Sequence, residues 1–321
     1  MPNPSTPSAD RPDINRPPLS PHRFTHQAMA TIFEIIIDHP DRAYAQQAAW
    51  AAFQVADNLE KALSRFLEYS DICRINSAKT GDKLVIGLDA FTCLQECNRM
   101  YMLTGGAFDI SVGALMDCWL DKDKKLKNPA AEELQALMQN RGKTLLLLND
   151  ADYSVEIKHS PLHIDLGGFG KGYAVDRMAE SLAEWDIENY ILHGGLSSVR
   201  AHGGMSGQTG WPVSISNPFQ NYAPLRQFNL HNRCMNGSGL QKGNHIIDPR
   251  SGRPLTIQRA AWAFSPDAAS GDALSTAFMV MSLDEIGQLC RTHHEFQAVI
   301  IEMENAQPGA EKVYYYGDIV Q

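Results

Sequence analysis

Apolar residues recur at helical spacing along a long stretch near the start of the chain. Residues 43–66 place an apolar residue at every third or fourth position, and this stripe predicts a long amphipathic helix. Its members are Ala49, Phe53, Ala56, Leu59, Leu63 and Phe66. The preceding residues 31–38 are dense in Ile and Phe, which is typical of a buried strand. Helical spacing returns over residues 90–103, 129–140, 175–185, 268–281 and 283–293.

Strand-like segments gather in the second half of the chain. Residues 144–149 and 153–157 are predicted to form a hairpin around the turn at 150–152. Further strands are predicted at 189–193, 197–202, 211–216, 225–230, 260–265, 297–302 and 313–316. Because strands follow one another in runs, with few strand-helix-strand units, the order favours an α+β fold over a doubly wound parallel sheet.

The predicted domain organisation is simple. No internal repeat and no linker rich in Gly, Pro or Ser interrupts residues 24–321, so we expect a single compact domain of mixed sheets with flanking helices. Residues 1–23 are predicted to be a disordered, proline-rich segment, because the first 21 residues hold seven prolines and no apolar run.

Composition narrows the class of protein. The chain has 28 Lys and Arg against 37 Asp and Glu, and this net charge of −9 argues against a nucleic-acid-binding protein. We expect no membrane span, because no run of about 18 apolar residues occurs. The lack of a secretory signal pattern and the six scattered cysteines favour a cytoplasmic location. Cys93 and Cys97 lie four apart on a predicted helix, which permits a metal site but more often means two buried small residues.

A glycine-rich segment carries the first candidate chemistry. Residues 163–176 set Asp165, a run of glycines and Lys171 at a predicted strand-to-helix junction, where a backbone can approach phosphates closely. The segment is not a Walker loop, because Asp165 stands at the first glycine position and Gly172 replaces the Ser or Thr that holds magnesium. It also lacks the Rossmann pattern. Two interpretations stay open, a phosphate-binding loop of another kind and a tight turn with a solvated lysine.

Two later segments add oxygen donors and a candidate base. Asp272 and Thr276 lie four apart on a predicted helix, so both side chains could reach one hard cation; alternatively, Asp272 caps the helix and Thr276 fills the core. His245 and Asp248 belong to a predicted strand that ends in a turn, and histidine is the natural general base near neutral pH. Residues 236–239 are interpreted as a loop, and no Gly-x-Ser-x-Gly elbow supports a serine hydrolase.

Taken in order, these pieces resemble the FAD:protein FMN transferases, also called the ApbE family. The resemblance extends from about residue 24 to the C-terminus. The matching segments are residues 29–31, 63–64, 70–76, 106–109, 165–176, 194–195, 245–252 and 272–276.

The resemblance implies an α+β enzyme that binds FAD and Mg²⁺. Such an enzyme transfers the FMN half of FAD onto a Thr or Ser hydroxyl of an acceptor protein and releases AMP. Magnesium would lie between the carbonyl of Gly168 and the side chains of Asp272 and Thr276. The implied FAD contacts are Met29, Phe66, Ala107, Phe108, Asp109, Asp165, Lys171 and Ile246.

The resemblance also suggests catalytic roles and a partner. His245 would accept the proton of the acceptor hydroxyl, with Asp272 and Asp248 as rivals, while Lys171 and Asp272 would act at the pyrophosphate. The acceptor would be a flavoprotein such as a flavin-dependent reductase or a redox-pump subunit.

Some residues depart from the family pattern and keep other functions open. Leu196 follows the paired glycines, where the family commonly has an acidic or amide residue, and Phe66 stands where Tyr is frequent. Gly168 replaces a common Ala, and the loop between Gly239 and His245 is short. One alternative is a Mg²⁺-dependent FAD pyrophosphatase that yields FMN and AMP. The other is a flavin-binding protein without catalytic activity.

Overall fold

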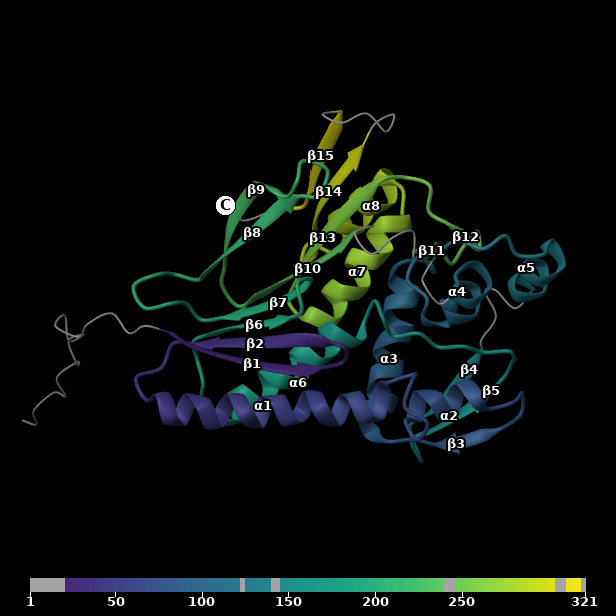
Figure 1. Cartoon of the computed structure of the whole chain (residues 1–321), viewed down its shortest axis with the longest axis horizontal. Coiled ribbons are helices and arrows are strands. Elements are labelled where there is room, and N and C mark those ends of the chain that lie inside the picture. Colours follow the sequence, from purple (N-terminus) through teal and green to yellow (C-terminus); the bar gives the residue numbers. More distant parts are fainter. Residues whose placement is uncertain (1–20, 122–124, 140–144, 240–245, 304–309, 319–321) are drawn as a thin grey trace, which may run out of the picture.

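An eight-stranded antiparallel sheet runs through the molecule (Figure 1). The computed structural model describes residues 21–121, 125–139, 145–239, 246–303 and 310–318. The strand order is β1-β2-β6-β7-β10-β13-β14-β15, and every neighbouring pair is antiparallel. The bounds are β1 (His22–Ala28), β2 (Thr31–Ile37), β6 (Tyr190–Gly194), β7 (Ser198–His202), β10 (Arg233–Gly239), β13 (Arg259–Ser265), β14 (Gln297–Met303) and β15 (Glu311–Tyr316).

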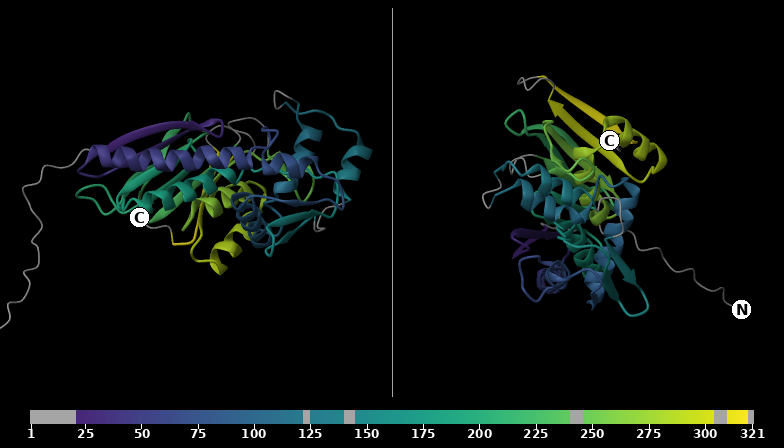
Figure 2. Two further views of the ribbon diagram at one scale, coloured as in Figure 1. Left: turned by 90° about the horizontal axis from the view of Figure 1, so that it is seen from below. Right: turned by 90° about the vertical axis from the view of Figure 1, so that its right-hand side faces the viewer.

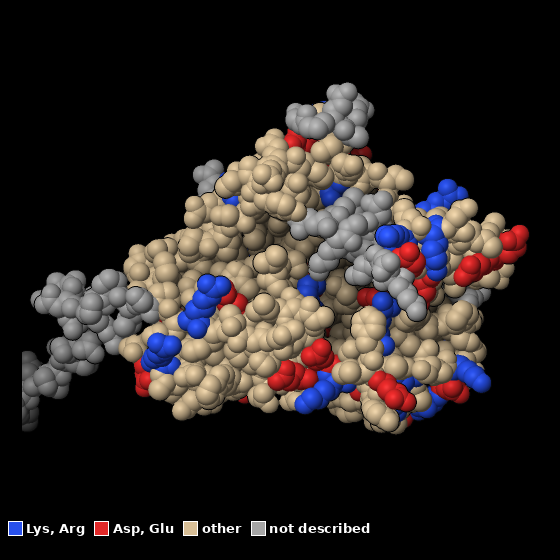
Figure 3. Space-filling view, in the orientation of Figure 1, with Lys and Arg blue, Asp and Glu red and all other residues tan. Residues whose placement is uncertain are grey.

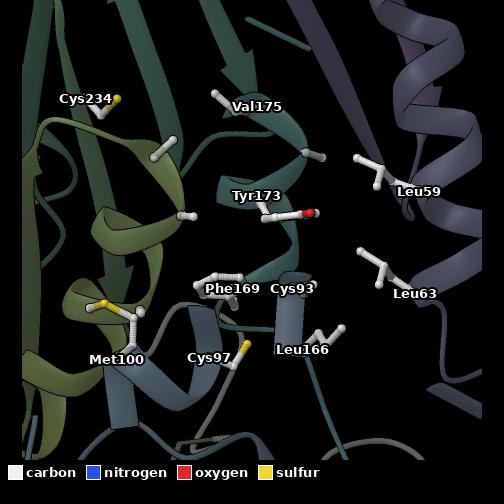
Figure 4. Packing of buried hydrophobic residues seen from close by; sticks show 14 of the residues in the cluster. Leu59, Leu63, Cys93, Cys97, Met100, Leu166, Phe169, Tyr173, Val175 and Cys234 are labelled. Atoms are coloured by element: carbon white, nitrogen blue, oxygen red, sulfur yellow. The ribbon is translucent and has the colours of Figure 1, made fainter. Parts of the chain in front are cut away.

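Helices cover one face of this sheet. In Figure 1, α1 runs along the lower edge beneath β1 and β2, and it packs against α6, which in turn packs against α7. The larger hydrophobic core lies between these helices and the sheet; Figure 4 shows Leu59 and Leu63 of α1 facing the segment that carries Phe169, Tyr173 and Val175. The helices concerned are α1 (Arg42–Leu63), α3 (Leu88–Leu103), α6 (Gly170–Glu184), α7 (Ala268–Val280) and α8 (Leu283–Thr292).

A two-stranded sheet covers the opposite face. β8 (Trp211–Asn217) and β9 (Ala223–Leu230) pair with each other and pack over the large sheet through a second hydrophobic cluster. Successive residues of a strand point to opposite faces, so Leu192 belongs to the helix-side core while Ile191 belongs to the second cluster. The inner strands β13 and β14 are therefore buried on both faces.

Smaller elements gather at one end of the molecule (Figures 1 and 2). A three-stranded sheet in the order β3-β5-β4 lies there with several short helices. On the face seen in Figure 3, Lys and Arg side chains alternate with Asp and Glu side chains and form no broad patch of one sign. The bounds are α2 (Asp71–Ser77), β3 (Lys83–Val85), η1 (Ile110–Val112), α4 (Gly113–Trp119), α5 (Ala131–Met138), β4 (Leu146–Asn149), β5 (Ser154–Ile157), β11 (Ile247–Asp248) and β12 (Arg253–Pro254).

The structure confirms the α+β prediction and most of the elements. The predicted helices over 268–281 and 283–293 are α7 and α8, and the predicted hairpin is β4 and β5. Cys93 and Cys97 are both buried in the core, which is the more common role of two cysteines at this spacing. Within the described ranges, no helix is both long and apolar enough to cross a membrane.

Three interpretations of the sequence are wrong. Residues 236–239, interpreted as a loop, belong to the central strand β10. The first helix ends at Leu63, since Ser64 adopts an extended conformation and its carbonyl accepts the hydroxyl of Ser70, so Phe66 lies outside the helix. The glycine segment follows no strand: residue Ile164 instead exchanges two hydrogen bonds with the side chain of Asn76.

Candidate active site

The glycine segment forms a tight turn that leads into α6. The carbonyl of Leu166 accepts hydrogen bonds from the N–H groups of Phe169 and Gly170, at 3.0 and 2.7 Å. Asp165 Oδ1 accepts the N–H of Gly167 at 2.6 Å, which fixes the start of the turn. Lys171 then lies in the first turn of α6, at the end of the helix that carries a partial positive charge and favours an anion.

Helix α7 crosses directly against this turn. A Cβ atom built on Gly168 would lie 2.8 Å from Thr276 Oγ1, and one built on Gly172 would lie 2.8 Å from Asp272 Cβ. Asp272 and Thr276 therefore share one face of α7, as their spacing predicted, and that face meets residues 168–172. The alternative role of Asp272 as a helix cap is wrong, because Asp267 caps α7.

The Asp272 carboxylate is buried and compensated. It is 2% exposed, and Lys171 Nζ lies 3.1 Å from its Oδ2 atom. The N–H of Gly172 donates to the same oxygen at 3.1 Å. Burying an ionised carboxylate is costly unless it is paired and hydrogen-bonded, and both conditions hold here. On the other side of the crossing, the Thr276 hydroxyl lies 3.4 Å from that of Ser238.

A second cluster joins the end of α1 to the glycine segment. Arg65 Nε lies 3.2 Å from Asp165 Oδ2, and Arg65 Nη1 lies 3.4 Å from His163 Nε2. The other nitrogen of the His163 ring pairs with Asp117. The Arg65 guanidinium also lies 4.8 Å from the centroid of the Phe66 ring, which is 82% exposed. Phe66 therefore presents an open aromatic face beside the glycine turn.

Residues 107–109 reach the same region from the end of α3. Ala107 and Phe108 are buried, and the Phe108 ring lies 6.0 Å from that of Phe169. Asp109 accepts hydrogen bonds from the N–H and the hydroxyl of Ser111 and so caps the short helix η1. The carbonyl of Ile110 accepts the N–H of Asp165 at 2.8 Å. This backbone contact places residues 107–109 beside the glycine segment.

The remaining predicted site residues lie on the turn between β1 and β2 and at strand β11. Met29 adopts a positive φ of 50° in the turn between β1 and β2. Ile246 is 9% exposed, and its carbonyl accepts the N–H of Leu255. Asp248, the alternative candidate for the general base, accepts the N–H of Arg250 at 2.9 Å and so stabilises a turn. His245 lies outside the described residues.

The comparisons with known proteins agree with this arrangement. A family model described as the ApbE family matches residues 29–300, which is most of the chain. The chain belongs to the ApbE family. The resemblance that the motifs suggested is confirmed.

Two curated relatives and one solved structure illustrate the relationship to ApbE proteins. A FAD:protein FMN transferase of Chlamydia muridarum is 26% identical over 245 residues, which cover 72% of this chain and 75% of the relative. One of Chlamydia trachomatis is 28% identical, with 74% and 77% covered. The solved flavin transferase ApbE from Vibrio cholerae superposes with a TM-score of 0.80 at 22% identity, covering 93% of this chain and 98% of that chain, and so has the same fold.

Sequence reasoning missed the buried charges that hold the ApbE helix α7. Asp176 lies in the glycine-rich motif, but nothing in the sequence identified its partners, Arg200 and the N–H groups of Ala268 and Ala269. At the other end of α7, Arg259 contacts three carbonyl groups. These contacts join segments far apart in the chain, so local patterns carry no signal for them.

Asp176 is expected to make the stability of this ApbE protein depend on pH. Burial raises the pKa of Asp176 to about 6, although Arg200 and two backbone N–H groups oppose the rise. The folded state then holds this proton more tightly than the unfolded chain does. Its contribution to the free energy of unfolding is therefore complete below about pH 4 and is lost as the pH rises through about 6.

Urea unfolding of the wild type and of Asp176→Asn over this pH range tests the expectation. The variant lacks the titrating carboxyl. Wild-type stability relative to the variant should therefore fall by up to about 3 kcal/mol between pH 4 and 7. A relative stability that stays constant or rises over this range would contradict the raised pKa.

Proposed function

We propose that this chain is a Mg²⁺-dependent FAD:protein FMN transferase. It would move the FMN half of FAD onto a Thr or Ser hydroxyl of an acceptor protein and release AMP. The observation that carries the proposal is the meeting of two segments about a hundred residues apart. Residues 168–172, which include Lys171 and the start of α6, lie directly against Asp272 and Thr276 of α7. The names of the relatives support the same activity.

The residues present fit a magnesium ion. Mg²⁺ prefers oxygen ligands and is commonly held by one or two carboxylates together with substrate phosphates. Asp272 provides a buried carboxylate, Thr276 a hydroxyl and Gly168 a backbone carbonyl within one small region. When bound, Mg²⁺ would neutralise pyrophosphate charge and so make the phosphorus atom more electrophilic. Within the described ranges, no three His, Cys, Asp or Glu residues lie together as a metal-binding group.

Residues of the protein would bind the pyrophosphate, stack against FAD and accept the hydroxyl proton. The ammonium of Lys171, at the positive end of the α6 dipole, would bind the pyrophosphate. The exposed ring of Phe66 offers a stacking surface for an aromatic ring of FAD, and residues 107–109, Asp165, Met29 and Ile246 would supply further FAD contacts. We assign His245 as the base that takes the hydroxyl proton. The hydroxyl oxygen then bonds to the FMN phosphorus, and the bond from that phosphorus to the AMP oxygen breaks.

The proposal extends to the partner and the location. The acceptor would be a flavoprotein such as a flavin-dependent reductase or a redox-pump subunit, and the reaction would take place in the cytoplasm. Leu196, fully exposed at the tip of the β6–β7 turn, stands where the family commonly has an acidic or amide residue. This difference fits an acceptor that varies among family members.

The first experiment incubates the protein with FAD and Mg²⁺ and analyses the products by chromatography and mass spectrometry. An acceptor fragment with the family's Ser- or Thr-containing target motif is present in one series and absent in the other. We expect AMP release together with a mass gain on the acceptor equal to FMN minus one water. Free FMN and AMP without modification would instead assign a pyrophosphatase. Unchanged FAD in both series would contradict either enzymatic function and favour a flavin-binding protein.

A further inference from the structure

Helix α7 is held at its N-terminal end by a carboxylate from another helix. Asp176 of α6 accepts the N–H groups of Ala268 and Ala269, at 2.9 and 2.7 Å. Arg200 of β7 pairs with the same carboxylate at 2.5 Å. The first N–H groups of a helix have no intrahelical acceptor and carry a partial positive charge, so a carboxylate both satisfies and neutralises this end.

The C-terminal end of α7 is held by a guanidinium. Arg259 of β13 is 4% exposed, and its Nη1 atom donates to the carbonyls of Phe278, Met279 and Met281 at 2.5 to 3.3 Å. The Glu302 carboxylate accepts from the other side of the same guanidinium, with Nε at 2.7 Å. The last carbonyls of a helix carry a partial negative charge, so a buried arginine complements this end.

The two anchors lie on either side of the proposed ligand residues. Asp272 and Thr276 fall between the residues that Asp176 binds and those that Arg259 binds. Both anchors come from outside α7, one from α6 and one from the large sheet. A helix that is bonded at both ends to separate elements cannot slide along its axis without breaking several buried or partly buried, charge-assisted hydrogen bonds.

We propose that Asp176 and Arg259 are positioning residues that fix α7 along its axis and so hold Asp272 and Thr276 against residues 168–172. The inference rests on the proposed function. Magnesium demands near-ideal octahedral geometry, and a shift of about 1 Å in a ligand is enough to impair such a site. Residues that orient metal ligands commonly change metal affinity roughly 10- to 100-fold when they are replaced.

Mn²⁺ binding tests the proposal without relying on turnover. Free Mn²⁺ is measured by electron paramagnetic resonance during titration of the full chain with FAD present. The variants are Asp176→Asn, which keeps an acceptor but loses the charge, and Arg259→Met. Arg259→Lys keeps the charge with fewer donors and serves if Arg259→Met does not fold. Asp41→Ala is the control, because it removes the N-cap of α1 and costs about 1 kcal/mol of stability far from both ends of α7.

We expect Asp176→Asn and Arg259→Met to weaken Mn²⁺ binding roughly tenfold or more, Arg259→Lys to weaken it less, and Asp41→Ala to leave it unchanged. Affinity for FAD without metal should stay the same in all four. Wild-type Mn²⁺ affinity in the folded variants would overturn the positioning role while leaving the proposed function intact. A wild type that binds no Mn²⁺ with FAD would overturn the proposed function and this inference with it.

Discussion

Asp272→Ala is expected to lower the rate of FMN transfer roughly a thousandfold or more. The substitution removes the buried carboxylate that we assign to the metal and leaves Lys171 without its partner at 3.1 Å. The metal that this carboxylate would hold neutralises charge on the pyrophosphate, so loss of the carboxylate raises the barrier directly. Asp272→Asn should be similarly inactive, because an amide oxygen keeps the shape but carries no charge.

AMP release from FAD, followed by chromatography, measures the effect. Asp41→Ala is the matched control: Asp41 caps α1 by accepting the N–H groups of Ala43 and Tyr44, so its loss costs about 1 kcal/mol of stability but touches no site residue. The control should retain near wild-type activity. An Asp272→Ala variant that keeps a tenth or more of the wild-type rate would exclude Asp272 as an essential ligand.

Gly172→Ala is expected to destabilise the protein by about 3 kcal/mol or more and to abolish activity. A Cβ atom at this position would lie 2.1 Å from the carbonyl oxygen of Ala268 and 2.8 Å from Asp272 Cβ. The first contact is with backbone, which cannot rotate away as a flexible side chain can. Helices α6 and α7 must therefore separate, and the separation moves Lys171 away from Asp272.

Gly170→Ala is a control within the same helical turn. The nearest atom to a Cβ at Gly170 is Leu166 Cβ at 3.7 Å, an ordinary van der Waals distance. Alanine is also the better helix former by up to about 1 kcal/mol, so this variant should be neutral or slightly more stable. Thermal or urea unfolding compares the two variants. Equal stability of both would show that α6 and α7 are not in close contact at Gly172.

The sequence predicted secondary structure best where apolar residues recur at a regular spacing. The apolar run over 268–281 predicted α7, and its spacing placed Asp272 and Thr276 on one face. The motifs of the glycine segment and of α7 also identified the family before their contact was known. Each of these signals is local, because it depends on residues within one element.

Elements without such periodicity were missed. β10 contains Asn236, Gly237, Ser238 and Gly239, which favour turns, yet it is held as a strand by pairing with β7 and β13. β1 was missed because its residues are mostly polar and it forms an edge of the sheet. The buried anchors of α7 could not be predicted, since Asp176 and Arg259 meet their partners only after the sheet and helices have assembled.

The separation of the two site segments along the chain also bears on how the protein is made. A growing chain that ends before residue 268 contains Lys171 and the glycine turn but lacks the helix that completes the site. Contacts between residues about a hundred positions apart form late, after the intervening strands have been synthesised and paired. Incomplete translation products would therefore be unable to consume FAD. The activity would appear only after nearly the whole chain has been synthesised and has emerged from the ribosome.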